Sequence, residues 1–381
     1  MNKKEKIQIL QDLIQIQSVN TNEKEVAVYL KDLLSKYGIQ SELITYDENR
    51  SNLVFEIQGQ KDKDTDQTLA FSGHFDVVGV DEDAWSYPPF AAEIHEEYMY
   101  GRGTADMKAG VAALIIAMIE LYEAGAPFSG TLRFLGSVGE EVGMFGSHQL
   151  TKAGYTKDVD ALLIAEPSGK DIIFAHKGSL MYEVISTGKA AHSSMPDKGI
   201  NALTQIAEFI QKAEKRLNEK TEEITNQQLG PMTNSFTVIQ GGEQINSIPA
   251  KVSLLGNART IPEFDQDKVI DVLNSVIEEV NQEIDGEIEL NIMHKIAPVE
   301  STPDSKIIQS IKKATNKDLM TTTFAGATDA SNYLNIDREI ELAIYSNFDL
   351  TQAHTVDEKI KVDDYLELID VYKKVAQNYL S

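Results

Sequence analysis

The chain has 381 residues, of which 42% are apolar and 25% charged, a composition typical of a globular protein with about two or three domains. Its net charge of -25 disfavours nucleic acids and anionic membrane surfaces as partners, because both carry negative charge. Cysteine is absent, which excludes disulfides and thiolate metal sites. Because we also find no export signal and no apolar run of roughly 18 residues, the sequence predicts a cytoplasmic protein without a membrane span.

Helices and strands alternate from the start of the chain. Apolar residues between Ile7 and Ile14 recur at helical spacing, and a second helix is expected between Asn22, a favoured N-cap, and Gly38. A further apolar run, residues 111–121, is typical of a buried helix. Runs typical of strands, some of them buried on both faces, cover residues 41–46, 52–58, 69–73, 131–137 and 162–165. This alternation predicts an α/β domain.

A different order of elements begins at Gly178. The expected elements are a strand, a helix, two strands, a helix and a strand, over residues 181–186, 201–217, 235–240, 252–258, 265–284 and 287–292. The order βαββαβ is that of a ferredoxin-like unit. Because the α/β character resumes after about His294, we expect an inserted α+β domain over residues 178–292 and a larger domain made of residues 1–177 and 293–381.

Several short motifs carry histidines and carboxylates, which are ligands that borderline divalent ions such as zinc accept. His74 and Asp76 end an apolar strand two residues apart, so their side chains point the same way and Asp76 can hold the imidazole. The alternative is a solvated strand end. Asp106 stands between a glycine-rich segment and the buried helix, where an aspartate can also serve as the N-cap.

Two more carboxylate motifs follow strands. Glu140 and Glu141 lie just beyond the strand over 131–137 and point in different directions, so one can bind a metal while the other acts as a base on water. Glu166 follows the strand over 162–165, and Pro167 makes the turn rigid. His354 lies far away in the sequence, near an expected helix start. Taken alone, each motif can also be explained by side chains that are simply exposed to solvent and have no functional role.

Together, and in this order, the motifs resemble the metal-dependent aminoacylase and carboxypeptidase family that includes acetylornithine deacetylase, succinyl-diaminopimelate desuccinylase and the glutamate carboxypeptidases. The resemblance spans nearly the whole chain. It implies an α/β, mixed-sheet zinc-hydrolase catalytic domain with an inserted ferredoxin-like α+β (βαββαβ) lid and dimerisation domain. It also implies two divalent metal ions, zinc first and cobalt or manganese as substitutes, and a homodimer built through the inserted domain.

The resemblance implies roles for individual residues. The five residues similar to the family's metal ligands are His74, Asp106, Glu141, Glu166 and His354. His74 and Glu166 would hold one ion, Glu141 and His354 the other, and Asp106 would bridge them. In the family a cis peptide bond follows the bridging aspartate.

Three residues resemble catalytic groups. Glu140 is similar to the general base that takes a proton from water, and Asp76 to the carboxylate that holds His74. His192 is similar to a histidine that contacts substrate from the partner subunit and supplies a donor to the oxyanion. A loop histidine that caps a nearby helix is the alternative for His192.

The substrate-binding residues implied by the resemblance are Arg259, Asn246, Gly326 and Thr328. Arg259 and Asn246 resemble positions that bind a substrate carboxylate, for which a guanidinium is well shaped. Gly326 and Thr328 lie in a loop similar to one that presents backbone and hydroxyl donors. A surface ion pair of Arg259 and a simple turn at Gly326 are the structural alternatives.

The expected substrate is a small N-acyl amino acid. Glu166 favours deacylases and carboxypeptidases, because relatives that need a free amino terminus often have aspartate there. Residues 72–78 and 101–108 are similar to the desuccinylase branch, which cleaves N-succinyl-LL-2,6-diaminopimelate in lysine biosynthesis. Residues 176–179 lack the arginines of that branch, so acetylornithine deacetylase, a carboxypeptidase or a dipeptidase remain alternatives. A catalytically inactive ligand-binding relative is the alternative of another class, although Glu140 and every candidate ligand are present.

Overall fold

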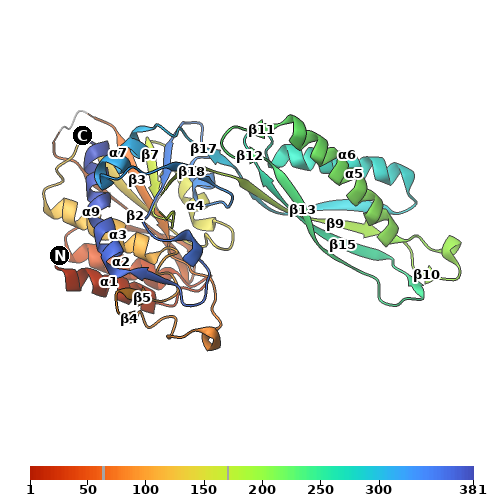
Figure 1. Ribbon diagram of the computed structural model, residues 1–381, viewed down its shortest axis with the longest axis horizontal. Helices are drawn as coiled ribbons and strands as arrows, with labels where there is room; N and C mark the ends of the chain where they lie inside the picture. Colours follow the sequence, from red (N-terminus) through yellow and green to blue (C-terminus); the bar gives the residue numbers. More distant parts are fainter. Residues whose placement is uncertain (62–64, 170) are drawn as a thin grey trace. The chain divides into compact units, whose positions relative to one another are not determined.

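The computed structural model describes residues 1–61, 65–169 and 171–381, which form two compact units (Figure 1). Unit 1 consists of Met1–Phe174, Ser301–Thr322 and Thr328–Ser381. Unit 2 consists of Ala175–Glu300 and Thr323–Ala327, and its chain is therefore inserted into that of unit 1. Among the helices described, none has the length and apolar character that a membrane crossing requires.

Unit 1 is organised around the larger sheet, which is mixed. Its strands, in spatial order, are β1 (Glu42–Asp47), β2 (Arg50–Gln58), β6 (Thr131–Ser137), β3 (Thr68–His74), β7 (Ala161–Ile164), β19 (Glu341–Ile344), β8 (Ile172–His176) and β17 (Val299–Glu300), and β18 (Thr321–Phe324) pairs with β8. By the bounds given above, β17 and the last residues of β8 and β18 are counted in unit 2. β3 lies between β6 and β7 and is parallel to both, and β19 is parallel to β7. The carboxyl ends of four adjacent strands therefore meet at one edge of the sheet, where ligands bind in open α/β sheets.

The helices of unit 1 bury this sheet. α3 (Lys108–Glu123) is apolar around most of its circumference and is almost wholly buried, as such a helix should be. It packs against β3, α1 (Lys3–Gln15) and α9 (Val362–Tyr379), which runs beside it in Figure 1. The remaining elements of this unit are α2 (Lys24–Lys36), α4 (Phe145–Lys152), α7 (Lys306–Thr315), α8 (Ala330–Tyr333), η1 (Glu82–Ala84), η3 (Leu350–Gln352), β4 (Ile94–His95), β5 (Tyr98–Tyr100) and β20 (Lys359–Lys361).

Unit 2 has the predicted ferredoxin-like architecture. Its main elements are β9 (Gly178–Thr187), α5 (Ala202–Glu223), β13 (Thr233–Gly241), β15 (Lys251–Thr260), α6 (Gln266–Glu283) and β16 (Glu287–Ile296). The four strands are antiparallel in the order β13-β15-β9-β16. α5 and α6 lie together on one face of the sheet (Figure 1) and bury apolar side chains such as Phe209 and Leu273. Short strands β10 (Ala191–His192), β14 (Ser247–Ile248), β11 (Thr225–Asn226) and β12 (Gly230–Pro231), with η2 (Pro196–Lys198), complete the unit.

All the strands and helices predicted from periodicity are present, with ends that differ by a few residues. The prediction that Asn22 caps the second helix is wrong. α2 begins at Lys24, and Glu23, which precedes it, makes no side-chain capping bond. Gly38 does end this helix, in the left-handed conformation that glycine adopts without steric cost.

Candidate metal centre

Three neighbouring parallel strands bring candidate side chains to one edge of the sheet. His74 is the last residue of β3, the acidic pair Glu140 and Glu141 follows β6, and Glu166 follows β7. His74 is aligned with Ser137 at the end of β6. Side chains that are far apart in the sequence therefore meet because their strands are adjacent and parallel.

Asp106 reaches the same place from the loop that precedes α3. The Asp106–Met107 peptide bond is cis, as the resemblance implied. Met107 precedes the first helical residue and α3 has no side-chain cap, so the alternative reading of Asp106 as the N-cap is wrong. Asp106 Oδ1 lies 3.1 Å from His74 Nε2, and Asp106 Oδ2 lies 3.4 Å from His354 Nε2. Each carboxylate oxygen thus faces a different histidine.

Each histidine also faces a glutamate. His74 Nε2 lies 3.5 Å from Glu166 Oε1, and His354 Nε2 lies 2.8 Å from Glu141 Oε1. His74 is buried, whereas the side chain of His354 is 52% exposed, so the centre is open on the His354 side. One ligand atom each from His74, Asp106 and Glu141 lies within 4.8 Å of the others, close enough for these residues to share an ion.

Electrostatics favour a cation at this place. Burial and the neighbouring carboxylates raise the pKa of both Glu140 and Glu166 well above the ordinary value, with only His74 opposing. Hydrogen bonds to Asp106 and Glu141 raise the pKa of His354 to about 10. Burial lowers the pKa of His74, but Glu166, Asp106 and Asp76 together outweigh it and raise that pKa. Buried acids that face two imidazoles form a donor set that suits divalent metal ions.

Asp76 organises the centre in two ways. Its backbone carbonyl lies 3.0 Å from His74 Nδ1, the arrangement that fixes the tautomer of a ligating histidine, and its carboxylate Oδ1 is 3.5 Å from the same nitrogen. The two carboxylate oxygens accept the backbone N–H groups of Glu140 and Glu141 at 3.1 Å and 3.0 Å. Burial opposes the charge, but His74 and these N–H donors outweigh it and lower the pKa of Asp76.

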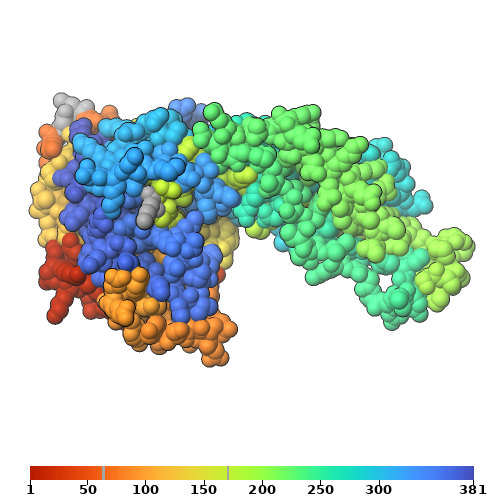
Figure 2. Space-filling model, in the orientation of Figure 1, coloured from red at the N-terminus to blue at the C-terminus, as the bar shows by residue number. Residues whose placement is uncertain are grey.

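His192 and Asn246 lie together in unit 2. β10 pairs with β14, and the Ser193 N–H donates to the Asn246 carbonyl at 2.9 Å. The two segments form the end of unit 2 seen at the right of Figure 2. His192 Nδ1 accepts hydrogen bonds from the Ser194 hydroxyl and N–H, at 2.7 Å and 3.2 Å, which places the ring proton on Nε2. The alternative reading, a loop histidine that caps a nearby helix, is wrong: Met195 precedes η2 without a side-chain capping bond, and Asn201 caps α5.

The other candidate substrate residues are separate from this pair. Arg259 is the second-to-last residue of β15 and is aligned with Ser179 on β9. Within the described ranges we find no ion pair for Arg259, so the structural alternative of a surface ion pair is not observed. Thr328 belongs to unit 1, is buried, and its hydroxyl accepts the Ala330 N–H at 3.3 Å. A Cβ at Gly326 would lie 2.2 Å from the Phe324 ring, so a larger residue there would require that ring to move.

Sequence reasoning missed two buried carboxylates. Asp329 accepts hydrogen bonds from the hydroxyls of Ser137, at the end of β6, and Ser147. Glu358 accepts hydrogen bonds from residues 102–106, the segment that ends in Asp106. Both carboxylates lie within a few residues of positions that the motifs singled out. Only their burial marks them as more than solvated acids, and burial cannot be read from these short loops.

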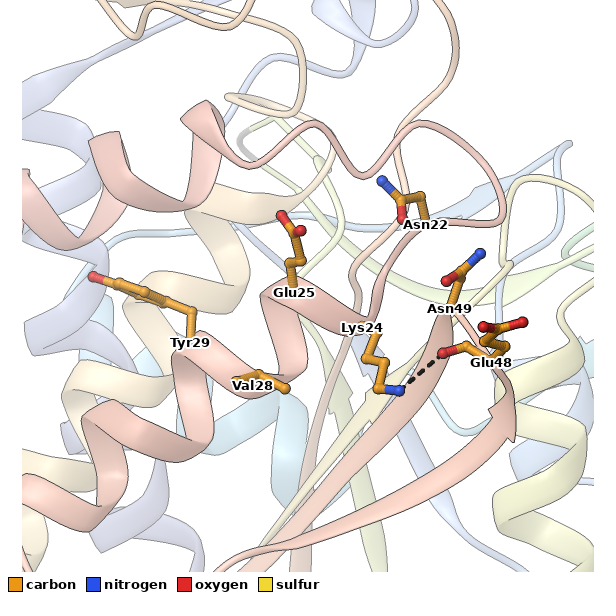
Figure 3. A pocket seen from close by; sticks show the side chains of 7 residues that line it. All are labelled: Asn22, Lys24, Glu25, Val28, Tyr29, Glu48 and Asn49. Carbon is orange, nitrogen blue, oxygen red and sulfur yellow. Dashed lines mark hydrogen bonds between the residues drawn. The ribbon is translucent and has the colours of Figure 1, made fainter.

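A surface pocket is found along α2, and none of the candidate site residues lines it (Figure 3). In it, Lys24 Nζ donates to the Glu48 carbonyl at 2.9 Å. The residues that line it are Asn22, Lys24, Glu25, Val28, Tyr29, Glu48 and Asn49. Without an imidazole, this pocket lacks the donor set of the candidate centre.

Known proteins resemble the chain over its full length. A "Probable succinyl-diaminopimelate desuccinylase" of Staphylococcus aureus is 38% identical over 408 aligned positions, which cover 100% of this chain and 98% of the relative. The crystal structure of the aminopeptidase PepT from Bacillus cereus has a TM-score of 0.78 at 22% identity, with all of both chains covered. The YXEP protein of Bacillus subtilis, described as a dinuclear metal binding peptidase, has a TM-score of 0.75 at 17% identity, with 99% and 98% covered.

The family assignment rests on a match to a family model. The model of peptidase family M20/M25/M40 matches residues 70–378, which include every candidate ligand. The two structural neighbours share the fold of the chain. The chain belongs to peptidase family M20/M25/M40 and is a metal-dependent hydrolase of amide bonds.

Proposed function

We propose that the chain hydrolyses N-succinyl-LL-2,6-diaminopimelate to LL-diaminopimelate and succinate, using two divalent metal ions, with zinc as the preferred metal. The observation that best supports metal-dependent hydrolysis is that two histidine–glutamate pairs, His74 with Glu166 and His354 with Glu141, both lie next to Asp106. The full-length relative at 38% identity, described as a probable desuccinylase, supports this choice of substrate.

In this proposal Asp106 would serve both ions. His74 and Glu166 would hold one ion and His354 and Glu141 the other, a division supported by the pairing of each histidine with one glutamate and with one oxygen of Asp106. Zinc suits two imidazoles and three carboxylates, and cobalt or manganese can replace it. Bound divalent ions would lower the pKa of water and polarise the amide carbonyl.

Glu140 is the proposed general base. Its backbone N–H donates to Asp76, and its carboxyl group is close enough to Glu166 and Glu141 for their charges to raise its pKa. Burial raises the pKa of Glu140, which makes its carboxylate a better proton acceptor. Glu140 takes a proton from the attacking water and passes it to the leaving amine.

Most of the proposed substrate contacts come from unit 2, and Thr328 adds one from unit 1. His192 presents an Nε2–H donor to the developing oxyanion, and Asn246 and Arg259 bind a substrate carboxylate. Gly326 and Thr328 contribute donors from their loop. Following the resemblance, His192 acts in the site of a partner subunit, so the active protein is a homodimer built through unit 2.

The exposed edge of the unit 2 sheet supports the proposed dimer. β13 is an edge strand on which Val238 and Ile239 are exposed, and such an edge is a template for pairing with another chain. Sedimentation equilibrium should give about twice the chain mass for the wild type and the single-chain mass for Ile239→Lys. A monomeric wild type that is fully active would rule out the dimer.

Lys177 is the observation that favours a second candidate. It is the basic side chain of residues 176–179, the segment expected to carry arginines in the desuccinylase branch, and its Nζ donates to the Pro231 carbonyl at 2.6 Å. A single ammonium lacks the planar fork that binds a succinyl carboxylate with two hydrogen bonds. Deacetylation of N-acetylornithine, which needs no such contact, is therefore the second candidate.

Steady-state kinetics on Zn²⁺-loaded protein tests both candidates. The substrates are N-succinyl-LL-2,6-diaminopimelate, N-acetylornithine, a dipeptide and a tripeptide at matched concentrations. We expect the highest kcat/KM for the succinylated compound, and complete loss of turnover when a chelator removes the metal. No turnover of the succinylated compound would eliminate the first candidate, and full activity after chelation would eliminate the metal mechanism.

A further inference from the structure

Glu358 is fully buried in unit 1, and hydrogen-bond donors surround its carboxylate. Oε1 accepts the backbone N–H groups of Ala105 and Asp106 at 2.6 Å and 3.1 Å. Oε2 accepts the Gly103 N–H at 3.2 Å and the Arg102 guanidinium at 2.7 Å. The segment from residue 102 to residue 106 is therefore wrapped around one carboxylate, and its last residue is the candidate bridging ligand.

Glu358 also joins two loops that carry candidate ligands. It lies four residues after His354, and its backbone carbonyl accepts the Gly101 N–H at 2.9 Å. Side chain and backbone of the same residue thus hold both ends of the segment that leads to Asp106. A shift of Glu358 would move Asp106 relative to His354.

The contacts explain why a carboxylate is needed here. The four N–H partners can only donate, and the Thr104 hydroxyl also lies 3.5 Å from Oε1, so both oxygens must accept. Glutamine has the same shape but would turn an NH₂ group towards either the Ala105 and Asp106 N–H groups or the Arg102 guanidinium. A buried donor facing a donor leaves both without a partner, which is costly.

We propose that Glu358 is a positioning residue for the metal centre: by holding the backbone of residues 102–106, it directs the two oxygens of Asp106 towards His74 and His354. This inference rests on the proposed function, since it concerns the metal that the function uses. Residues that orient metal ligands typically account for about 10–100-fold in metal affinity.

The test compares Glu358→Gln with Glu56→Gln. Glu56 accepts a 2.6 Å hydrogen bond from Arg133 on the neighbouring strand, so the control makes the same chemical change at another buried arginine. Binding of Zn²⁺ alone is measured by equilibrium dialysis, together with thermal unfolding, kcat and KM. Glu358→Asp keeps the charge and serves as a conservative second variant.

We expect Glu358→Gln to bind Zn²⁺ about 10–100-fold more weakly than the wild type, with a fall in kcat larger than any change in KM. Glu56→Gln should bind Zn²⁺ normally even if it unfolds at a lower temperature, and Glu358→Asp should recover part of the affinity. Wild-type affinity in Glu358→Gln overturns the inference. If that variant does not fold, wild-type affinity in Glu358→Asp overturns it instead. A wild-type protein that binds no Zn²⁺ would overturn the proposed function itself.

Discussion

Glu140 and Glu141 are neighbours in the sequence whose side chains have different surroundings. Asp76 holds the backbone N–H groups of both, which fixes the direction in which each side chain leaves the loop. Glu141 pairs with His354, whereas Glu140 does not. A one-residue offset therefore separates a proposed metal ligand from a proposed base.

Replacing each glutamate by glutamine should separate these roles. Glu140→Gln removes the proton acceptor, so we expect unchanged Zn²⁺ binding and a kcat lowered by about 10²–10⁴-fold. Glu141→Gln removes a ligand and should weaken Zn²⁺ binding by about 10-fold or more. Equilibrium dialysis and steady-state kinetics on both variants measure this. Wild-type turnover by Glu140→Gln would show that another group accepts the proton.

His176 gives unit 2 a predicted sensitivity to acid. It is fully buried, its Nδ1 lies 2.9 Å from the Lys177 carbonyl, and burial lowers its pKa from 6.5 to about 4. Between pH 6.5 and about 4, His176 is protonated in the unfolded chain but remains neutral in the folded chain. Stability should therefore fall by about 3 kcal/mol as the pH falls from 6.5 to about 4, with no effect of this histidine above pH 6.5.

Urea unfolding of metal-free protein at several pH values tests this contribution. His176→Asn keeps an N–H donor but does not titrate, so its stability should fall less steeply than that of the wild type between pH 6.5 and about 4. His148→Asn, at an exposed position on α4, is the control and should follow the wild type. Parallel curves for wild type and His176→Asn would contradict the assignment.

At the scale of elements, the sequence predicts strands and their ends better than it predicts the loop contacts that hold the ligand segments in place. Apolar runs followed by His74, Glu141 or Glu166 mark strand ends, and parallel pairing then brings these residues together. The sequence does not reveal that Glu358 contacts residues 102–106, because a loop has no period from which a contact 252 to 256 residues away could be inferred. β8 and β19 were also missed, since short apolar runs are ambiguous between strand and helix.

The packing of α3 against the end of β7 is close enough to require glycine. A Cβ at Gly110 would lie 2.3 Å from the Ala165 carbonyl oxygen, and Ala165 precedes the candidate ligand Glu166. Alanine normally stabilises a helix by about 1 kcal/mol relative to glycine. Here the clash is with backbone, which cannot rotate away, so overpacking should dominate.

We therefore expect Gly110→Ala to lower stability by about 1–3 kcal/mol and to weaken Zn²⁺ binding by displacing Glu166. Chemical denaturation and equilibrium dialysis measure the two effects. Gly79→Ala is the matched control, since a Cβ there meets nothing within 4 Å and the change should be neutral or slightly stabilising. A Gly110→Ala protein more stable than the wild type would mean that the helix shifts freely.

At the scale of the whole molecule, all five proposed metal ligands belong to unit 1, although their positions range from residue 74 to residue 354. Unit 2 is inserted between Glu166 and His354 in the chain and has a core of its own under α5 and α6. In the sequence, His354 is thus separated from the other four proposed ligands by a unit that has its own hydrophobic core. Metal binding should then stabilise one unit far more than the other.

Hydrogen exchange measured by mass spectrometry, with and without Zn²⁺, tests this difference. A ligand at about 1,000 times its Kd stabilises the state that binds it by about 4 kcal/mol. We expect slower exchange after Zn²⁺ addition for peptides from β3 and α9, and little change for peptides from β9 and β15. Glu141→Gln, which lacks a proposed ligand, should show a smaller gain at the same Zn²⁺ concentration. Equal protection of both units would mean that the chain unfolds as one cooperative block, and protection of neither would contradict the metal centre.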